Sequence, residues 1–339
     1  MSGKLRKRIL LLVLVVGVGA LALAVLLPPR YHAVSKSLPA SFDDYFKQKL
    51  QESKEKGARP GNDEKLIRFA DKTEFAILYI HGYGASRAEG EYVVDQLAEK
   101  FKANTYYMRL PGHGTNVEDH ASATFSDYIN AAEEAYQMTK LLGDHVIIVG
   151  TSMGGLLTTY LASRHPEIAG VVLASPFYDF TDPRVHLANE PAMIYVLEGV
   201  NGGPIRKSES KEGQPDNKWI SGHEDFWLQN QYVKAVISLE NLREYAANTA
   251  TYEKVTVPVL MLYYYKDEEH QDPTASVPAM LDAFAKFGTA EKPNPLNRAV
   301  AIEDGEHVLL SKWLHTDHER ALKEMTDFLS DVRNQIEKK

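Results

Sequence analysis

A serine placed between glycines is the first feature of this chain that could do chemistry. The stretch GTSMGG, residues 150–155, puts Ser152 where one apolar run ends and the next begins. On such a strand-to-helix turn the hydroxyl projects above the sheet, and larger side chains at the glycine positions would collide with the neighbouring strand and helix. The sequence therefore predicts a nucleophile at Ser152. An ordinary glycine-rich turn with an inert serine is the alternative.

A serine hydroxyl is a weak nucleophile, so it needs a base that is oriented by an acid. Turns of this kind predict the chain order serine, acid, histidine. Of the 12 histidines, His307 alone follows the final predicted strand, residues 297–303, by a short turn. We therefore expect His307 to lie over the sheet edge and to act as the base.

The acid is expected in the loop after the apolar run at residues 257–265. This loop reads KDEEHQDP and contains four acids, Asp267, Glu268, Glu269 and Asp272. Asp267 is the first acid beyond the run, where the sheet edge comes nearest to the histidine loop, and it is the preferred candidate. Glu268 and Asp272 stay open as alternatives.

Acyl transfer also requires hydrogen-bond donors for the oxyanion of the tetrahedral intermediate. The backbone N–H of Met153, the residue after the serine, is one expected donor. The loop HGYG, residues 81–84, follows an upstream strand, and its glycines let the backbone approach a substrate closely. The N–H of Tyr83 is the second expected donor, and His81 is expected to order the loop by hydrogen bonds.

Apolar runs of strand length alternate with segments of helical period through most of the chain. Strands are expected at residues 65–70, 75–80, 105–110, 145–150, 170–176, 257–265 and 297–303, and helices at 88–103, 125–142, 153–165, 276–287 and 318–336. This alternation predicts an α/β fold with a mostly parallel sheet and helices on both of its faces.

The interval at about 177–254 breaks the alternation and is predicted to be a lid over the carboxyl edge of the sheet, where open α/β sheets bind ligands. It contains four prominent aromatic residues, Trp219, Phe226, Trp227 and Tyr232. They are expected either to line an acyl pocket or to pack as the core of the lid.

The N-terminus predicts contact with a membrane. Residues 9–27 include no charged side chain and follow four basic residues, and their length as a helix approaches the thickness of a bilayer core. Residues 1–29 are therefore expected to be a transmembrane anchor, with the catalytic domain outside the cytoplasm, in the periplasm or extracellular space. A cleaved signal segment, which would make the protein secreted, is the alternative.

The remaining chain is divided into two parts. Residues 30–63 are polar and are expected to form a stalk, which includes a short helix capped by Ser41. Residues 64–339 are expected to form the α/β domain with its inserted lid. The net charge of −8 argues against a nucleic-acid partner, and the lack of cysteine excludes disulfides, thiolate zinc sites and a cysteine nucleophile.

Together these motifs resemble the α/β-hydrolase superfamily, and within it the monoacylglycerol lipase and serine aminopeptidase-like group of carboxylesterases. HGYG, LPGHGT, GTSMGG, the acid after PVLMLYYY, and GEHV occur in the order typical of that family. The resemblance begins at about Leu66, and the acid loop is longer than the usual aspartate turn.

The resemblance implies hydrolysis of a small-molecule ester through an acyl-enzyme on Ser152, with no cofactor and no metal. Three alternatives stay open. An aminopeptidase would use lid acids such as Glu224 or Asp225 to face a substrate amine. An acyltransferase would use an alcohol in place of water, and a non-catalytic membrane-tethered binding domain would keep only the fold.

Overall fold

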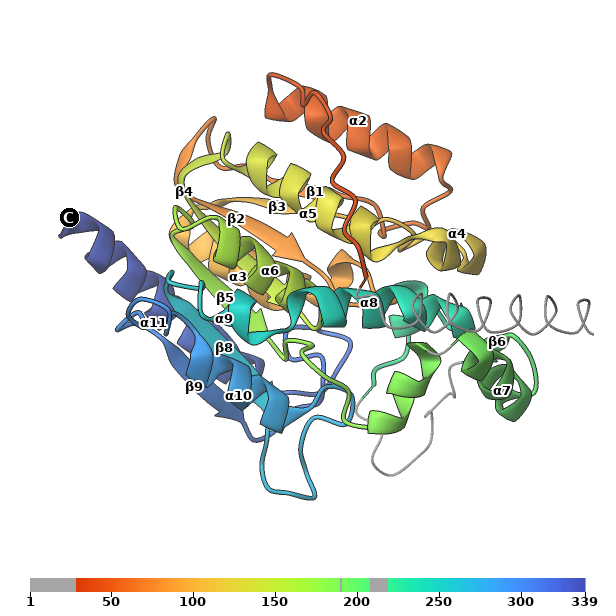
Figure 1. Ribbon diagram of the computed structural model, residues 1–339. Helices are drawn as coiled ribbons and strands as arrows, with labels where there is room; N and C mark the ends of the chain where they lie inside the picture. The colour runs from red at the N-terminus through yellow and green to blue at the C-terminus, as the bar shows by residue number, and fades with distance from the viewer. Residues whose placement is uncertain (1–28, 190, 208–218, 339) are drawn as a thin grey trace, which may run out of the picture.

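A seven-stranded sheet forms the centre of the molecule (Figure 1). The computed structural model describes residues 29–189, 191–207 and 219–338. In spatial order the strands are β1 (Lys65–Ile67), β3 (Asn104–Tyr107), β2 (Thr73–Ile80), β4 (Gly143–Thr151), β5 (Gly170–Ala174), β8 (Val259–Tyr264) and β9 (Arg298–Ile302). Only the β1–β3 pair of this sheet is antiparallel, so the prediction of a mostly parallel sheet is confirmed.

The central strands are apolar on both sides because helices cover both faces of the sheet. On β2, Leu78 and Ile80 pack into one hydrophobic layer, whereas Ile77 and Tyr79 pack into the other. A strand buried on both faces reads as a continuous apolar run rather than an alternating one. This explains why the strand signals in the sequence were strong.

The predicted helices are present within a few residues of their expected bounds. One face of the sheet is covered by α3 (Glu91–Phe101) and α11 (His318–Glu337). The other face carries α5 (Phe125–Thr139), α6 (Met153–Arg164), α8 (Val236–Ala246), α9 (Thr249–Tyr252) and α10 (Val277–Lys286). The short helix α4 (Val117–Ser122) precedes α5.

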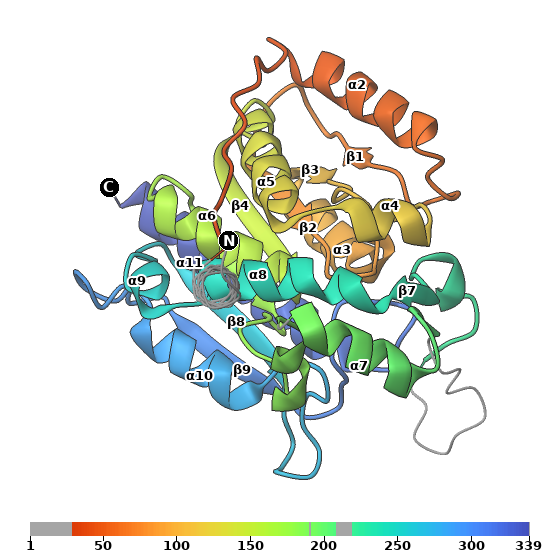
Figure 2. The ribbon, with the colours of Figure 1, turned by 45° about the vertical axis from the view of Figure 1, so that its right-hand side comes forward.

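The interval after β5 forms a separate set of short elements beside the sheet. It contains the 3₁₀ helix η2 (Pro183–Asn189), α7 (Pro191–Asn201), the two-stranded ribbon of β6 (Ile205–Lys207) and β7 (Asn230–Tyr232), and the 3₁₀ helices η3 (His223–Asp225) and η4 (Val233–Ala235). Both ribbon views place α7 outside the sheet, beyond α8 (Figure 2). Residues 208–218 of this interval lie outside the described part of the chain.

The predicted membrane segment at residues 1–29 lies almost wholly outside the described residues, which begin at residue 29. Within the described ranges, no helix has both the length and the apolar character needed to cross a bilayer.

The prediction of a stalk at residues 30–63 is wrong, because this segment packs against the α/β domain. Its predicted helix is present as α2 (Phe42–Glu55), and the Ser41 side chain accepts a hydrogen bond from the N–H of Asp44, as the capping prediction required. Phe42 and Tyr45 are buried, and both rings contact Tyr106 of β3. Figures 1 and 2 show α2 lying alongside α5 and β1.

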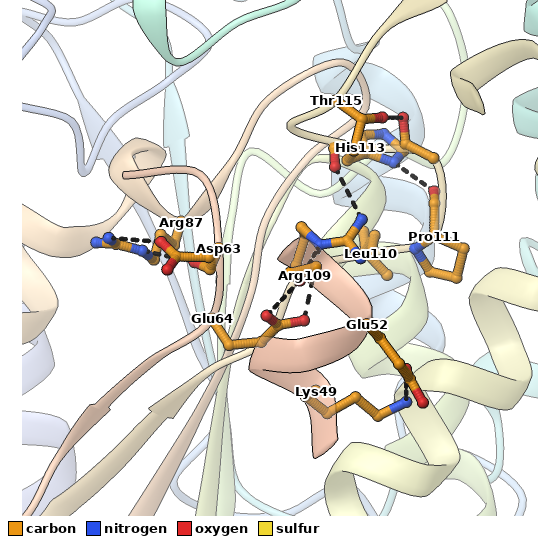
Figure 3. Close-up of polar contacts among 12 residues, drawn as sticks. Lys49, Glu52, Asp63, Glu64, Arg87, Arg109, Leu110, Pro111, His113 and Thr115 are labelled. Atoms are coloured by element: carbon orange, nitrogen blue, oxygen red, sulfur yellow. Dashed lines mark hydrogen bonds and ion pairs between the residues drawn. The ribbon is translucent and has the colours of Figure 1, made fainter. Parts of the chain in front are cut away.

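A buried polar network fixes the same segment to the sheet (Figure 3). The Arg109 Nε donates to the Ser53 Oγ at 2.6 Å, and the Ser53 hydroxyl donates to the Glu64 carboxylate at 2.6 Å. Glu64 is only 5% exposed, and it lies 3.7 Å from the Arg109 guanidinium. A buried carboxylate needs such partners to offset its desolvation. The segment is therefore part of the folded domain.

Candidate active site

Ser152 occupies a strained turn between β4 and α6. Its backbone has φ 54° and ψ −118°, a conformation that side-chain-bearing residues rarely adopt. Its N–H donates to the carbonyl of Ala174 at 3.0 Å, and its own carbonyl accepts from Phe177 N–H at 3.0 Å. These bonds to the end of β5 hold the turn at the carboxyl edge of the sheet, where the prediction placed the hydroxyl.

The glycines around Ser152 are required by close backbone contacts. A Cβ atom at Gly150 would collide with the carbonyl of Gly154, and one at Gly154 would collide with the carbonyl of Ile80. Both obstacles are backbone atoms, which cannot rotate away as the end of a side chain can. The structure thus confirms the steric reason that the sequence analysis gave for the glycines.

His307 lies against Ser152, as expected. Its Nε2 is 2.8 Å from the Ser152 Oγ, although 155 positions separate the two residues in the chain. On the other side of the ring, Nδ1 is 2.7 Å from Oδ2 and 3.0 Å from Oδ1 of Asp272. With Nδ1 protonated, the ring donates to Asp272 and accepts from the serine hydroxyl.

The acid beside His307 is Asp272, so the preference for Asp267 is wrong. Asp267 is exposed and accepts hydrogen bonds from Nδ1 of His270 at 2.7 Å and from its backbone N–H at 2.9 Å. The cause is the path of the loop. Tyr265 forms a bridge with Gln271, and Asp272 N–H donates to the carbonyl of Tyr264, so the chain leaves the end of β8 and returns to it at Asp272.

Asp272 is held rigidly and is fully buried, with 0% exposure. Its Oδ1 accepts from the N–H groups of Thr274 and Ala275, each at 2.9 Å. Burial lowers the pKa of His307, but the charge and hydrogen bond of Asp272, together with the charges of Glu89 and Glu306, outweigh burial and raise the pKa above its usual value. The site therefore stabilises the imidazolium form.

The two predicted oxyanion donors belong to segments that adjoin Ser152. Met153 is the first residue of α6, so its N–H has no acceptor within the helix. Tyr83 lines the same cavity as Ser152 and His307. Whether the two N–H groups bind an oxyanion stays a prediction.

The prediction that His81 orders the loop is confirmed by its hydrogen bonds. Its Nδ1 lies 2.9 Å from the carbonyl of Gly82, and its Nε2 accepts from the N–H of Leu110 at 3.1 Å. Burial lowers the pKa of His81 to about 4, so the ring is neutral at neutral pH. His81 therefore joins the loop after β2 to the loop after β3.

Sequence reasoning missed a buried carboxyl group at the site, that of Glu89. Its Oε2 accepts from Gly82 N–H at 2.5 Å, the side chain is 2% exposed, and it lines the cavity that contains Ser152. The structural mark of this position is the next residue, Gly90, where a Cβ would collide with the ring of Tyr79. That contact is not readable without the fold, because Tyr79 lies on β2.

A cavity of about 780 Å³ opens above the Ser152–His307 pair. Several aromatic and aliphatic side chains line it: Phe177, Phe180, Trp219, Trp227, Leu228 and Leu239. Of the four aromatic residues predicted to line a pocket or to pack as core, Trp219 and Trp227 line the cavity. The other two are not among its lining residues: Phe226 packs on Trp313, with ring centroids 5.2 Å apart, and the Tyr232 hydroxyl donates to Glu118 Oε1 at 3.5 Å. Over the described ranges, no three histidine or carboxylate side chains are grouped as a metal site requires.

Comparison with known proteins places this arrangement in a family. A family model of α/β hydrolases matches residues 77–324, which include the serine turn, Asp272 and His307. The chain belongs to the α/β-hydrolase family. The family resemblance predicted from the motifs is thereby confirmed, and the match excludes the N-terminal segment with α2.

This α/β hydrolase is similar in sequence to a thermostable monoacylglycerol lipase of Bacillus sp. (strain H-257). The two are 26% identical over 208 residues, which cover 60% of this chain and 74% of the lipase.

Solved structures of lipolytic enzymes share the fold. A structure from a study of LipS and LipT, two metagenome-derived lipolytic enzymes, has a TM-score of 0.64 at 19% identity and covers 82% of this chain and 99% of its own. The monoacylglycerol lipase of Paleococcus ferrophilus has a TM-score of 0.56 at 16% identity, with 78% and 98% covered.

Proposed function

We propose that this α/β hydrolase is a serine carboxylic ester hydrolase that works through an acyl-enzyme on Ser152. The observation that carries the proposal is the chain of hydrogen bonds through His307, 2.8 Å to Ser152 Oγ on one side and 2.7 Å to Asp272 on the other. The sequence similarity to a monoacylglycerol lipase supports the same reaction class.

In the first half-reaction the Ser152 Oγ attacks the ester carbonyl while Nε2 of His307 takes its proton. Asp272 keeps the imidazole in the tautomer that accepts this proton, and it stabilises the imidazolium that results. The negative oxygen of the tetrahedral intermediate is bound by the N–H groups of Tyr83 and Met153. His307 then gives its proton to the leaving alcohol, which leaves an acyl-enzyme.

In the second half-reaction water takes the place of the alcohol. His307 removes a proton from water, the hydroxide attacks the acyl carbon, and the proton passes to Ser152 Oγ as the ester bond to the enzyme breaks. The products are a carboxylic acid and the free enzyme. An alcohol in place of water would make the protein an acyltransferase, and the same residues would serve that reaction.

The substrate class that fits the cavity is an ester of an apolar acyl chain with a small alcohol, such as a glycerol monoester. The cavity volume of about 780 Å³ accommodates a medium-sized chain, and Phe177, Trp219 and Trp227 provide an apolar wall. The interval between β5 and β8 supplies the two tryptophans, which supports its predicted role as a lid over the site.

We also propose that residues 1–29 anchor the protein in a membrane with the hydrolase domain outside the cytoplasm. The uncharged run at 9–27 after four basic residues supports this location. Separation of membrane and soluble fractions tests it, because a cleaved signal segment would leave the protein in the soluble fraction.

The aminopeptidase alternative has weaker support. Glu224 lines the cavity, but its carboxylate accepts from Gly222 N–H at 2.8 Å and lies 3.5 Å from His223, so it is already engaged.

Hydrolysis of p-nitrophenyl esters and of aminoacyl amides by the wild type and by Ser152→Ala tests the proposal that the protein is a serine ester hydrolase. We expect ester hydrolysis that is lost in the variant. Ester hydrolysis at the wild-type rate by a folded Ser152→Ala protein would refute it.

A further inference from the structure

Glu89 places a buried carboxyl group beside Ser152 and beside the loop of Tyr83, the proposed oxyanion donor. It ends the 3₁₀ helix η1 (Arg87–Glu89), and its Oε2 accepts from Gly82 N–H at 2.5 Å. A Cβ at Gly82 would lie 2.8 Å from the Glu89 Oε1 and 3.1 Å from the Ser152 Cβ. The carboxyl and the serine therefore both lie against the same glycine, which immediately precedes Tyr83.

The same carboxyl is connected to the nucleophile turn through Tyr79. The Tyr79 hydroxyl donates to the Glu89 Oε2 at 3.3 Å and lies 3.0 Å from the Thr151 Oγ1. Thr151 is the last residue of β4 and directly precedes Ser152. Glu89 and Tyr79 together thus connect the loop after β2 with the turn after β4. Gly82, in the loop, precedes Tyr83, and Thr151 precedes Ser152.

Burial of Glu89 outweighs the groups that stabilise its negative charge. Burial raises its pKa to about 7, although the Gly82 N–H, the Tyr79 hydroxyl and the charge of His307 act in the opposite direction. The ionisable groups that face it are Tyr79 from β2 and His307 from the loop after β9. Arg87, on the same 3₁₀ helix, instead pairs with Asp63 and Glu91.

We propose that Glu89 is a positioning residue for ester hydrolysis: it holds Gly82 so that the N–H of the adjacent Tyr83 points at the oxyanion. When the carboxyl group of Glu89 is ionised, its negative charge repels that oxyanion and destabilises the tetrahedral intermediate. The inference rests on the proposed function of Ser152. The family resemblance did not indicate it, and the catalytic sequence motifs do not include this position.

The two parts of the proposal have different physical origins. Holding Gly82 requires only an oxygen acceptor, which an amide supplies as well as a carboxylate does. Opposition to the oxyanion requires the charge, since two negative groups in a site of low dielectric repel strongly. The charge also stabilises the His307 imidazolium, so its removal lowers the pKa of His307. Glutamine and alanine at position 89 therefore separate the two effects.

The test compares Glu89→Gln and Glu89→Ala with the wild type in the full-length protein, using kcat and KM for p-nitrophenyl butyrate between pH 5 and 9. We expect Glu89→Ala to lower kcat about 10- to 100-fold with little change in KM, as a displaced oxyanion donor does. We expect Glu89→Gln to keep kcat within about threefold of the wild type. Its rising limb of kcat/KM should move to lower pH, and its activity at pH 9 should equal or exceed that of the wild type.

Several outcomes would overturn the inference. One is a Glu89→Ala protein with the kcat and pH profile of the wild type. Another is an equal loss of kcat in both variants, because it would show that the neutral amide oxygen of glutamine does not hold Gly82 in place. If Glu89→Ala does not fold, an unshifted rising limb in Glu89→Gln would also refute the proposal. Loss of ester hydrolysis in Ser152→Ala, measured beside them, shows separately whether the proposed function holds.

Discussion

The N–H of Asp272 donates a hydrogen bond to the carbonyl of Tyr264, the last residue of β8. This bond closes the loop of residues 265–271 and returns the chain to the sheet edge, where the carboxylate of Asp272 meets His307 at 2.7 Å. Asp272 therefore lies next to the end of β8 in space, although Asp267 is the first acid after β8 in the chain. The loop carries Asp267 away into solvent, where it caps the turn at His270.

The first prediction concerns these two aspartates. Asp272→Asn should lower kcat about 10³- to 10⁴-fold, because an amide no longer selects the productive histidine tautomer or stabilises the imidazolium. Asp267→Asn is the matched control, since it removes the same charge from the same loop, and it should stay within about twofold of the wild type. Steady-state ester hydrolysis by both proteins checks the assignment. A large loss in Asp267→Asn with an active Asp272→Asn would reverse it.

The second prediction concerns the pH dependence of the reaction. His307 must be neutral to accept the serine proton, so kcat/KM should rise with pH through its pKa. Because Asp272 and the neighbouring acids raise that pKa, the midpoint of the rise should lie above about 6.5, the value of an unperturbed histidine. Asp272→Asn should move the midpoint to lower pH. A wild-type midpoint well below 6.5 would contradict this electrostatic account.

The third prediction concerns the backbone of the serine turn. Gly154→Ala places a methyl group against the carbonyl of Ile80, and it should lower the free energy of unfolding by about 1–3 kcal/mol. Gly199→Ala in α7 is the control, because nothing lies within 4 Å of its Cβ position. That substitution should leave stability unchanged or raise it by up to about 1 kcal/mol. Urea unfolding of the two proteins measures the difference, and equal stabilities would refute the steric argument.

The fourth prediction concerns the docked N-terminal segment. Tyr45→Ala removes a buried ring that packs on Tyr106, and it should destabilise the domain by about 3–5 kcal/mol, as truncation of large buried aromatic side chains does. Lys47→Ala, on the exposed face of the same helix, should change stability by less than about 0.5 kcal/mol. Thermal and urea unfolding compare the two. If both variants had wild-type stability, α2 would be a free stalk after all.

The sequence was sufficient for features that depend on local geometry. The GTSMGG turn needs glycines because the backbone itself is crowded there, and apolar runs covered by two helical layers are easily recognised. His307 was identifiable because parallel strands end at one edge of the sheet, so a histidine after the final strand arrives near Ser152.

Features that depend on the path of a loop or on distant contacts were not accessible in the same way. Asp272 reaches His307 because the chain returns to Tyr264, and the spacing of residues in the sequence does not predict that return. The docking of α2 depends on two buried aromatic rings within an otherwise polar segment, and average polarity conceals them. Glu89 becomes a site residue only through Tyr79, which lies on β2, and Gly82, which lies in the loop after β2.

The central claim is that the Ser152 hydroxyl is the nucleophile that His307 activates. Its most direct test is the reaction of the purified protein with a fluorophosphonate, followed by mass spectrometry of the digested peptides. The account predicts one adduct, on Ser152, formed at least about 10³-fold more slowly in His307→Ala. An adduct on a different residue, or labelling of Ser152 at the wild-type rate without His307, would contradict it.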